Sequence, residues 1–307
     1  MSKIKIEALG GMQENGKNLY VVEVDEQIFI LDAGLIYPEI DLYGIDAAIP
    51  NIDYLIENKN RVVGIFVSHG HEDHIGAIPY LLKAINVKVF GTHFTISLIE
   101  ELLELNGMDV KKYRLYRIND TKELTFGNVS VVFYNVNHSI PESAGIVLYT
   151  EDGAIVYAQD FNFAKSLSKK YKISYNRLLE LNNKKVLAVM SESIGITDTI
   201  RASNDLVFDN EINNALYKTK GNMFVVCYST DLSRIQKIVT AATNFGKKIA
   251  IIGRKGEQIV NMAVKTNYLE NEKIAVIDKT GKLLDTTTVY PTEPQNDVEG
   301  AKKVLKG

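Results

Sequence analysis

A loop near residue 70 is rich in side chains that bind metal ions. Residues 68–76 read SHGHEDHIG and contain four candidate ligands, namely His69, His71, Asp73 and His74. The chain has only five histidines, and three of them lie between positions 69 and 74, so an accidental polar loop is a poor explanation. Imidazole nitrogens and carboxylate oxygens are ligands that zinc prefers. The loop therefore predicts a metal site.

The spacing within this loop favours two metal ions over one. His69 and His71 are separated by one residue, so they point the same way if the backbone is extended. The adjacent pair of Asp73 and His74 then turns toward a neighbouring point. Two ions about 3.5–4 Å apart lower the pKa of a bridging water and stabilise both the attacking and the leaving oxygen. The pattern is typical of a two-metal hydrolase.

Three further candidates lie where predicted strands end. His138 follows the run VVFYNVN, and Asp160 follows AIVYAQ. Each alone would be interpreted as a polar strand-end residue, but beside the histidine loop both become candidate ligands, and the two oxygens of Asp160 allow it to bridge two cations. Asp32, which follows QIFIL, is a candidate to orient a ligand histidine. His93 is interpreted as structural or solvent-facing.

Short apolar runs bounded by turn residues must position these side chains. Runs at 19–24 and 27–31 flank Asp25 and Glu26 and predict a hairpin. Helical spacing of apolar residues predicts helices over 75–84 and 95–105. Further strands are predicted at 62–67, 129–136, 145–149 and 154–158. The first part of the chain is therefore expected to be strand-rich, with candidate ligands at strand ends.

After about residue 200 the predicted elements alternate between strand and helix. A strand at 222–228, a helix at 233–244, a strand at 248–253 and a helix at 258–266 follow one another. Strand and helix alternating at this spacing predict a parallel sheet with right-handed crossovers. We therefore predict two domains, residues 1–200 and residues 201–307.

The composition is that of a globular protein and excludes several classes. Of 307 residues, 46% are hydrophobic and 24% charged, and the single cysteine, Cys227, excludes a disulfide framework. The 35 basic and 38 acidic residues give a net charge of −3, which argues against nucleic-acid binding by bulk charge but allows a local basic groove.

No run approaches the ~20 apolar residues of a membrane span, and the first residues lack a signal peptide's apolar core. A cytoplasmic protein without a membrane partner is expected.

Together these motifs resemble the ribonuclease J family, of the β-CASP branch of the metallo-β-lactamase superfamily. The His-x-His-x-Asp-His series from His69, followed by His138 and Asp160, is similar to the ligand series of the superfamily. Segments that resemble ribonuclease J extend from about residue 4 to about residue 270. They lie at 8–11, 16–18, 32–34, 37–39, 44–46, 49–50, 68–81, 138–143 and 160–161, with Ser229, Arg234 and 253–254 further on.

The resemblance implies an α/β fold, namely a four-layered αββα metallo-β-lactamase sandwich with the start of an inserted parallel α/β β-CASP domain. It implies a zinc-dependent ribonuclease of RNA processing and decay that cuts internally and from a 5′-monophosphate end, with Mn²⁺ or Mg²⁺ as alternative ions. The residues implied are His69, His71 and His138 for one zinc, Asp73 and His74 for the other, Asp160 as the bridge, and Asp73, His74 and Asp160 as the catalytic group.

The sequence departs from the family at the second metal. The family's later histidine that closes this site has no counterpart, because no histidine follows His138. Two family segments also differ, reading DFNFA from Asp160 and SESI from Ser191. Besides a ribonuclease of which this chain is the N-terminal portion, two hypotheses stay open. One is a non-catalytic ribonuclease J-like partner or RNA-binding subunit in a homo- or hetero-oligomer. The other is a hydrolase of the same fold that acts on a small ester or thioester, against which the segment after residue 200 argues.

RNA contacts are expected from side chains of the second domain. Ser229, Arg234 and Arg254 are the candidates, because Arg234 lies near the start of a predicted helix, whose free backbone N–H groups favour phosphate. A lysine-rich stretch follows Asp160 and fits a phosphate groove and an ordinary solvated surface equally well; it contains Lys165, Lys169, Lys170 and Lys172.

Overall fold

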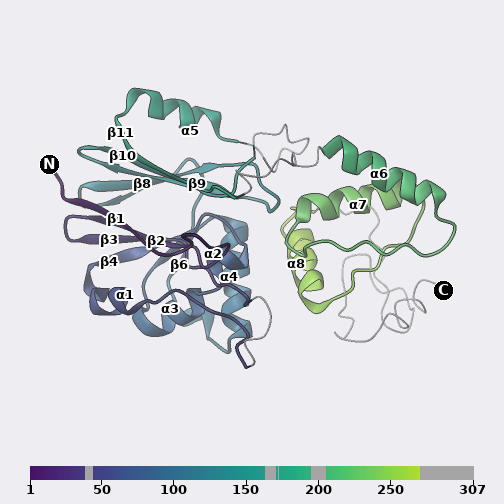
Figure 1. Cartoon of the computed structure of the whole chain (residues 1–307), viewed down its shortest axis with the longest axis horizontal. Coiled ribbons are helices and arrows are strands. Elements are labelled where there is room, and N and C mark those ends of the chain that lie inside the picture. The colour runs from purple at the N-terminus through teal and green to yellow at the C-terminus, as the bar shows by residue number, and fades with distance from the viewer. Residues whose placement is uncertain (39–43, 163–170, 172, 195–204, 270–307) are drawn as a thin grey trace. The chain divides into compact units, whose positions relative to one another are not determined.

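The structure is a computed structural model, and it describes residues 1–38, 44–162, 171, 173–194 and 205–269 (Figure 1). The chain forms two compact units, Met1–His138 with Glu142–Ile194 (unit 1) and Ser139–Pro141 with Gly195–Gly307 (unit 2). The predicted domain boundary at residue 200 lies outside the described residues. None of the described helices is long and apolar enough to cross a bilayer.

The first sheet of unit 1 has six strands in sequential order. They are β1 (Ile4–Gly10), β2 (Leu19–Val24), β3 (Gln27–Leu31), β4 (Val62–Phe66), β5 (Val89–Gly91) and β6 (Leu115–Arg117). The predicted hairpin is confirmed, since β2 and β3 pair antiparallel across Asp25, whose φ of 53° makes the tight turn. Strands β3 to β6 run parallel. Parallel β3 and β4 therefore end at one edge, which brings Asp32 beside Ser68.

The second sheet has five strands in the order β11-β10-β9-β8-β7. They are β7 (Glu123–Phe126), β8 (Val129–Asn135), β9 (Ala144–Thr150), β10 (Gly153–Ala158) and β11 (Val186–Ser191). All pairs are antiparallel except β10 with β11. Because β9 runs antiparallel between β8 and β10, these two strands end at the same edge of the sheet. His138 and Asp160 follow them there.

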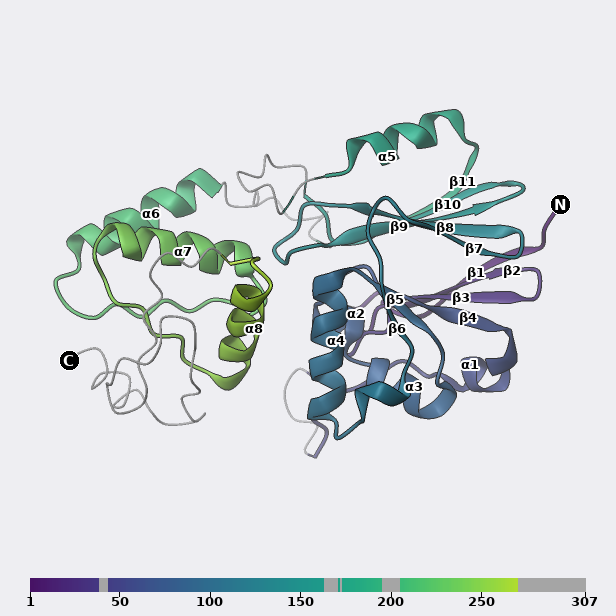
Figure 2. The ribbon, with the colours of Figure 1, turned by 180° about the vertical axis from the view of Figure 1, so that it is seen from behind.

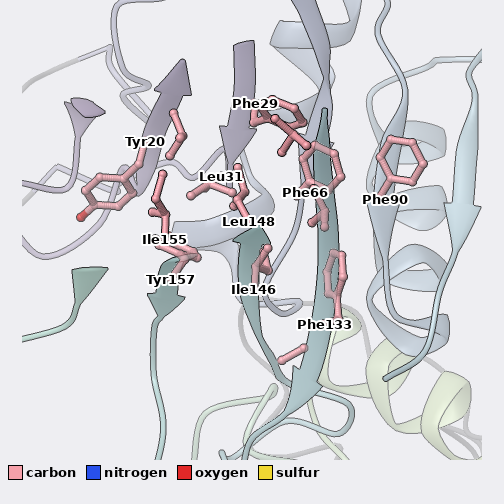
Figure 3. Close-up of a cluster of buried hydrophobic side chains, with 14 of the residues drawn as sticks. Tyr20, Phe29, Leu31, Phe66, Phe90, Phe133, Ile146, Leu148, Ile155 and Tyr157 are labelled. Carbon is pink, nitrogen blue, oxygen red and sulfur yellow. The ribbon is translucent and has the colours of Figure 1, made fainter. Parts of the chain in front are cut away.

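The two sheets face each other across an apolar core (Figure 3). Alternate residues of each strand point inward, as a pleated strand with one face in the core requires. Phe66 and Phe90 stack with ring centroids 4.9 Å apart. The largest buried members are Tyr20, Phe29, Leu31, Phe66, Phe90, Phe133, Ile146, Leu148, Ile155 and Tyr157. This packing fixes the strands whose ends carry the candidate ligands.

Helices cover the outer faces of both sheets, which completes four layers (Figures 1 and 2). On the first sheet lie α1 (Asp53–Glu57), α2 (Glu72–Ile75), α3 (Ile78–Ile85) and α4 (His93–Leu105), with short 3-10 turns at Lys59–Arg61 and Val110–Lys112. On the second lie α5 (Tyr175–Glu180) and the 3-10 turn Leu181–Asn183, where Leu178 and Leu181 pack on Val132 and its neighbours. The predicted αββα sandwich is confirmed.

Unit 2 contains α6 (Asp205–Lys218), α7 (Leu232–Asn244) and α8 (Arg254–Lys265) in its described part. Ile212, Leu216 and Ala241 form a small core between α6 and α7. The helices predicted at 233–244 and 258–266 are confirmed. The strands predicted at 222–228 and 248–253 are wrong, since neither forms a ladder among the described residues.

The failure of these two strand predictions has a physical cause. A parallel sheet needs both faces covered, yet most side chains of the first segment are exposed, and those at 249–251 of the second are only partly buried. Val226 is 97% exposed, Tyr228 84% and Ile252 51%. The apolar run therefore marks residues without a covering layer in the described part of unit 2.

Candidate metal centre

The ligand loop of unit 1 runs from the end of β4 into the short helix α2. His71 is the N-cap residue of α2 in an extended conformation (φ −74°, ψ 151°), and Asp73 and His74 lie within the helix. The neighbouring chain packs closely on this loop. A Cβ at Gly34 would lie 1.5 Å from the carbonyl oxygen of Asp73, so only glycine fits there. The helix start is what separates the first pair of ligands from the second.

Four side chains converge into a first donor group, formed by His69, His71, His138 and Asp160. His71 Nδ1 lies 2.9 Å from His69 Nε2 and 3.1 Å from His138 Nε2. Asp160 Oδ2 lies 3.2 Å from His69 Nε2 and 3.5 Å from His138 Nε2. Three imidazole nitrogens and one carboxylate oxygen thus surround one point, the donor set of a zinc site.

A second donor group lies beside the first and shares Asp160 with it. Its members are Asp73, His74 and Asp160. His74 Nε2 lies 3.4 Å from Asp73 Oδ2 and 3.5 Å from Asp160 Oδ2. Asp160 has φ of 45°, an uncommon conformation for a residue with a side chain and one that recurs at functional sites. The sharing of one carboxylate by two groups is the arrangement that bridged ions require.

The electrostatics of the cluster favour the metal-binding forms of His71, His138 and Asp73. Burial, together with the positive charges that neighbouring histidines would carry, lowers the pKa of His71 well below its usual value and that of His138 to about 3. Burial alone would raise the pKa of Asp73, but hydrogen bonding to His74 lowers it to about 2. Neutral imidazole and ionised carboxylate are the forms that bind a cation. The donor set therefore fits divalent metal ions.

Asp32 is a fully buried carboxylate that connects β3, the ligand loop and β10. Its Oδ1 accepts a hydrogen bond from Ser68 N at 2.7 Å, and its Oδ2 accepts bonds from Ser68 Oγ at 2.8 Å and Tyr157 Oη at 2.7 Å. His74 Nδ1 lies 2.7 Å from the same Oδ2. This contact fixes the ring so that Nε2 faces the second donor group, which is the orienting geometry predicted for Asp32.

Burial alone would lower the pKa of His74. The Asp32 carboxylate and hydrogen bonds to Asp160, Asp32 and Asp73 outweigh burial, so the pKa is raised well above its usual value. His74 therefore lies where positive charge is stabilised from several sides. A cation at its Nε2 experiences the same carboxylates.

The loop that carries His138 is attached to helix α4 by Glu142. The Glu142 carboxylate accepts a 2.6 Å hydrogen bond from Phe94 N in the first turn of α4, and Thr92 Oγ1 donates to the Glu142 carbonyl oxygen at 3.0 Å. A carboxylate is favourable at this end of a helix. His93 is exposed and belongs to neither donor group among the described residues.

Three side chains at the centre escaped the sequence analysis. Asn18 places its amide 3.2 Å from His74 Nε2, and the Tyr157 hydroxyl is bonded to Asp32. Burial and the charge of Asp160 raise the pKa of Glu192 to about 7. Asn18 lies in one of the family-like segments, so that segment was the available signal. Tyr157 lies in a strand pattern that does not distinguish it, and Glu192 lies in the segment SESI, which was noted only as a departure from the family.

The residues predicted to contact RNA lie at or next to the starts of α7 and α8, and a Cβ at Gly256 in the first turn of α8 would lie 3.7 Å from Ser229 Cβ. Arg234 is exposed on α7, where its Nε lies 3.4 Å from Asp231 Oδ2 and its guanidinium lies over the Phe208 ring. Asp231 also accepts a hydrogen bond from Arg234 N, so a carboxylate already occupies this helix end. Ser229 lies in the turn before α7, and Arg254 begins α8 with a side chain outside the described part. Lys165, Lys169, Lys170 and Lys172 also lie outside it.

The family model of the metallo-β-lactamase superfamily matches residues 13–177, which include every member of both donor groups. The chain belongs to the metallo-β-lactamase superfamily. Divalent metal binding is a property of this superfamily, and this chain brings together histidine and aspartate side chains that could hold such ions. A second model, that of the ribonuclease J β-CASP domain, matches residues 220–290.

Individual relatives agree with both matches. The chain is 38% identical over 295 residues to ribonuclease J 2 of Staphylococcus aureus strain NCTC 8325, covering 96% of this chain and 51% of the relative. It is 38% identical over 274 residues to ribonuclease J 2 of Staphylococcus epidermidis, covering 89% and 49%. The chain thus spans about half the length of the curated relatives it matches. The expected resemblance to the ribonuclease J family is confirmed.

One solved structure shares the fold over nearly the whole chain. It is a protein of unknown function from Enterococcus faecalis V583, with a TM-score of 0.63, 15% sequence identity, and coverage of 97% of this chain and 78% of that one. At this identity the likeness concerns the fold alone.

Proposed function

We propose that this chain is the metal-binding part of a ribonuclease of the ribonuclease J type, which hydrolyses RNA phosphodiesters. The observation that carries the proposal is the convergence of six side chains into two donor groups that share Asp160, in a chain similar to ribonucleases over 96% of its length. Two-metal sites are common in enzymes that break phosphodiester bonds. RNA with a 5′ monophosphate is the proposed substrate.

The two groups are proposed to hold one ion each. His69, His71 and His138 would hold Zn²⁺ in the first, Asp73 and His74 would hold a second ion that is Zn²⁺, Mn²⁺ or Mg²⁺, and Asp160 would contact both. When bound, such ions act as Lewis acids on the phosphodiester and lower the pKa of the attacking water.

The protein's own contribution is to turn these ligands correctly and to favour the neutral form of His71 and His138, whose pKa values burial lowers. Asp32 fixes the His74 ring through Nδ1, and Ser68 Oγ lies 2.9 Å from His69 Nδ1, so the Nε2 atoms of both rings remain directed at the donor groups. Glu142 holds the end of the His138 loop on α4. Asp73, His74 and Asp160 are the proposed catalytic group.

RNA binding is proposed for unit 2, through Ser229, Arg234 and Arg254. The match to a ribonuclease J β-CASP domain over residues 220–290 supports this proposal and argues against a small-ester hydrolase. Assembly with a second ribonuclease J-type chain and a cytoplasmic location are part of the same proposal. The non-catalytic alternative is favoured by one observation, since the second donor group has three His and Asp members whereas the first has four.

The test is the decay of a 5′-monophosphorylated, end-labelled RNA with the 307-residue chain and added Zn²⁺ or Mn²⁺. The proposal predicts cleavage that falls at least about 100-fold in Asp73→Asn, since one removed metal-site residue costs 10–100-fold or more. His93→Ala is the matched control and retains the rate. Parallel assays with a thioester substrate distinguish a ribonuclease from a small-ester hydrolase, which would cleave the thioester and leave the RNA intact. If two ions are bound and no RNA is cut, the catalytic proposal is wrong for this chain and the partner hypothesis replaces it.

A further inference from the structure

Tyr116 is a partly exposed aromatic residue at the free lateral edge of the first sheet of unit 1. It lies in β6, which pairs with β5 on one side, and no described strand lies beyond it on the other. Tyr116 is 41% exposed. A large aromatic side chain at an unpaired edge is accessible to another molecule.

The Tyr116 ring is held flat by the aromatic core beneath it. It stacks on Phe90 with ring centroids 5.0 Å apart and planes inclined by 18°, and Phe90 stacks on Phe66 at 4.9 Å and 11°. Phe66 is fully buried and Phe90 is 5% exposed, and both lie in the core that Figure 3 shows. Tyr116 thus ends a row of three nearly parallel rings. Because Phe90 covers one face of the ring and no strand covers the edge, the opposite face is open to a further flat ring.

The chain around Tyr116 carries an excess of positive charge. Residues 109–123 contain five cations and three carboxylates, in a protein whose net charge is −3. Arg117 is paired with Glu100 of α4 at 2.6 Å. The carboxylate of Asp120 is half-buried and accepts a hydrogen bond from Ser174 Oγ at 2.7 Å. The remaining cations are exposed and form no ion pair with a described residue, namely Lys111, Lys112, Arg114 and Lys122.

This charged and aromatic surface lies within reach of the candidate metal centre. β4, β5 and β6 are neighbouring parallel strands, so their carboxyl ends lie at the same end of the sheet. The ligand loop follows β4, and β6 lies two strand spacings away, which is about 10 Å at about 4.8 Å per spacing. One RNA chain is therefore long enough to contact both the donor groups and Tyr116.

We infer that the β6 edge of unit 1 is a contact surface for single-stranded RNA, where a base stacks on Tyr116 while Lys111, Lys112 and Arg114 contact backbone phosphates. An aromatic platform beside cations is the combination that binds single strands without sequence preference, because every base has a π face. Duplex RNA keeps its base faces covered and lacks this contact. The inference rests on the proposed function, and it adds an RNA contact in unit 1 to those proposed for unit 2.

The test measures binding of a 3′-fluorescein-labelled oligouridylate of about 12 nucleotides, a length within known single-strand site sizes, to the full chain by fluorescence anisotropy. All proteins carry Asp73→Asn so that the RNA stays intact. Tyr116→Ala is expected to weaken binding at least about fivefold, the smallest effect of losing one base stack. Tyr116→Phe keeps the ring and retains the affinity. Tyr175→Ala, which removes a 59% exposed tyrosine from α5 of the same unit, is the matched control and also retains it.

The phosphate contacts are tested separately through the salt dependence of binding. Lys111→Gln combined with Lys112→Gln is expected to reduce the slope of log affinity against log salt concentration by up to about 1.4, since each lost phosphate contact on a single strand removes about 0.7. Lys59→Gln changes an exposed lysine elsewhere in unit 1 and leaves the slope unchanged. Duplex RNA of the same length is expected to bind Tyr116→Ala as well as it binds the parent chain.

The outcomes separate this inference from the proposed function. Unchanged single-strand affinity in Tyr116→Ala overturns the stacking contact and leaves the metal centre and its proposed activity intact. Equal losses in Tyr116→Ala and Tyr116→Phe, or an equal loss for duplex RNA, overturn it as well, because base stacking then does not explain the effect. An unchanged salt slope in the double lysine variant, which does not alter the aromatic stack, overturns the phosphate contacts. A parent chain that binds no RNA contradicts the proposed function itself, and with it this inference.

Discussion

Units 1 and 2 differ in how completely the described residues bury their apolar side chains. In unit 1, Phe133 of β8 is 1% exposed inside a core between two sheets. In unit 2, Phe224 is 50% exposed and its neighbour Val226 is 97% exposed. All strands of the described residues lie in unit 1, whereas the described part of unit 2 contains helices and segments without a strand ladder. A strand pattern in a sequence thus becomes a strand only where a partner and a covering layer exist.

The same difference separates the candidate sites. The donor groups of unit 1 lie at strand ends held by the two-sheet core and by the buried carboxylate of Asp32. The proposed RNA contacts of unit 2 lie at helix starts, where Arg234 is paired with Asp231. We therefore expect substitutions in unit 1 to have large effects and chemically similar substitutions in unit 2 to have small ones.

The largest contrast is expected from one substitution made in both units. Phe133→Ala removes a buried ring from the core and is expected to lower the free energy of unfolding by about 3–5 kcal/mol. Phe224→Ala, at a half-exposed ring, is expected to lower it by less than about 1 kcal/mol. Urea denaturation followed by circular dichroism measures both. Equal losses would show that unit 2 buries its apolar residues as well as unit 1 does.

Asp32→Ala is expected to lower the free energy of unfolding by about 3–5 kcal/mol, because it leaves the buried polar groups of Ser68, His74 and Tyr157 without their partner. Asp32→Asn keeps the shape and an acceptor, and φ of 59° at this position is one that Asn tolerates. The Asn variant is therefore expected to lose less stability. Thermal denaturation of the two variants distinguishes them, and an Ala variant as stable as wild type would remove Asp32 from its structural role.

His71→Ala is expected to weaken binding at the first metal site about 100-fold or more, because it removes one of three imidazole ligands. His93→Ala changes an exposed histidine of the same unit and is expected to leave metal content unchanged. Elemental analysis after dialysis against a weak chelator measures both. Metal loss in the His93 variant, or full retention in the His71 variant, would contradict the ligand assignment.

The smallest effect is expected from Val226→Ser. The side chain is almost fully exposed, and surface substitutions of this kind change the free energy of unfolding by about 0.5 kcal/mol or less. The same denaturation experiment measures it. A loss of more than about 1 kcal/mol would mean that Val226 is covered in solution. Unit 2 would then bury its apolar side chains more as unit 1 does.

Sequence reasoning succeeded where chemistry and spacing are local. The side chains from His69 to His74 are positioned by the end of a strand and the start of a helix. The apolar patterns at 62–67 and 75–84 predicted both elements. His138 and Asp160 could be added because each directly follows a predicted strand and the histidine loop already indicated a metal site. The metal-binding assignment itself stays a prediction, and so does the choice of ions.

Long-range contacts account for what sequence reasoning missed. Asn18 reaches the centre through backbone bonds to Asp73 and Gly34, and Tyr157 through a contact with Asp32 over 125 positions. The family-like segment at 16–18 marks Asn18 without naming its partner, and nothing around Tyr157 signals its contact with Asp32. The two strands wrongly predicted in unit 2 fail for the converse reason, since their apolar pattern says nothing about whether a partner strand exists.

Anomalous diffraction from crystals of this chain grown with Zn²⁺ and Mn²⁺ tests the central claim most directly. The account predicts two separate peaks. A zinc peak should lie among His69, His71 and His138, a second peak between Asp73 and His74, and both should contact Asp160. A single peak, or ions bound away from Asp160, would contradict a two-ion centre in this protein.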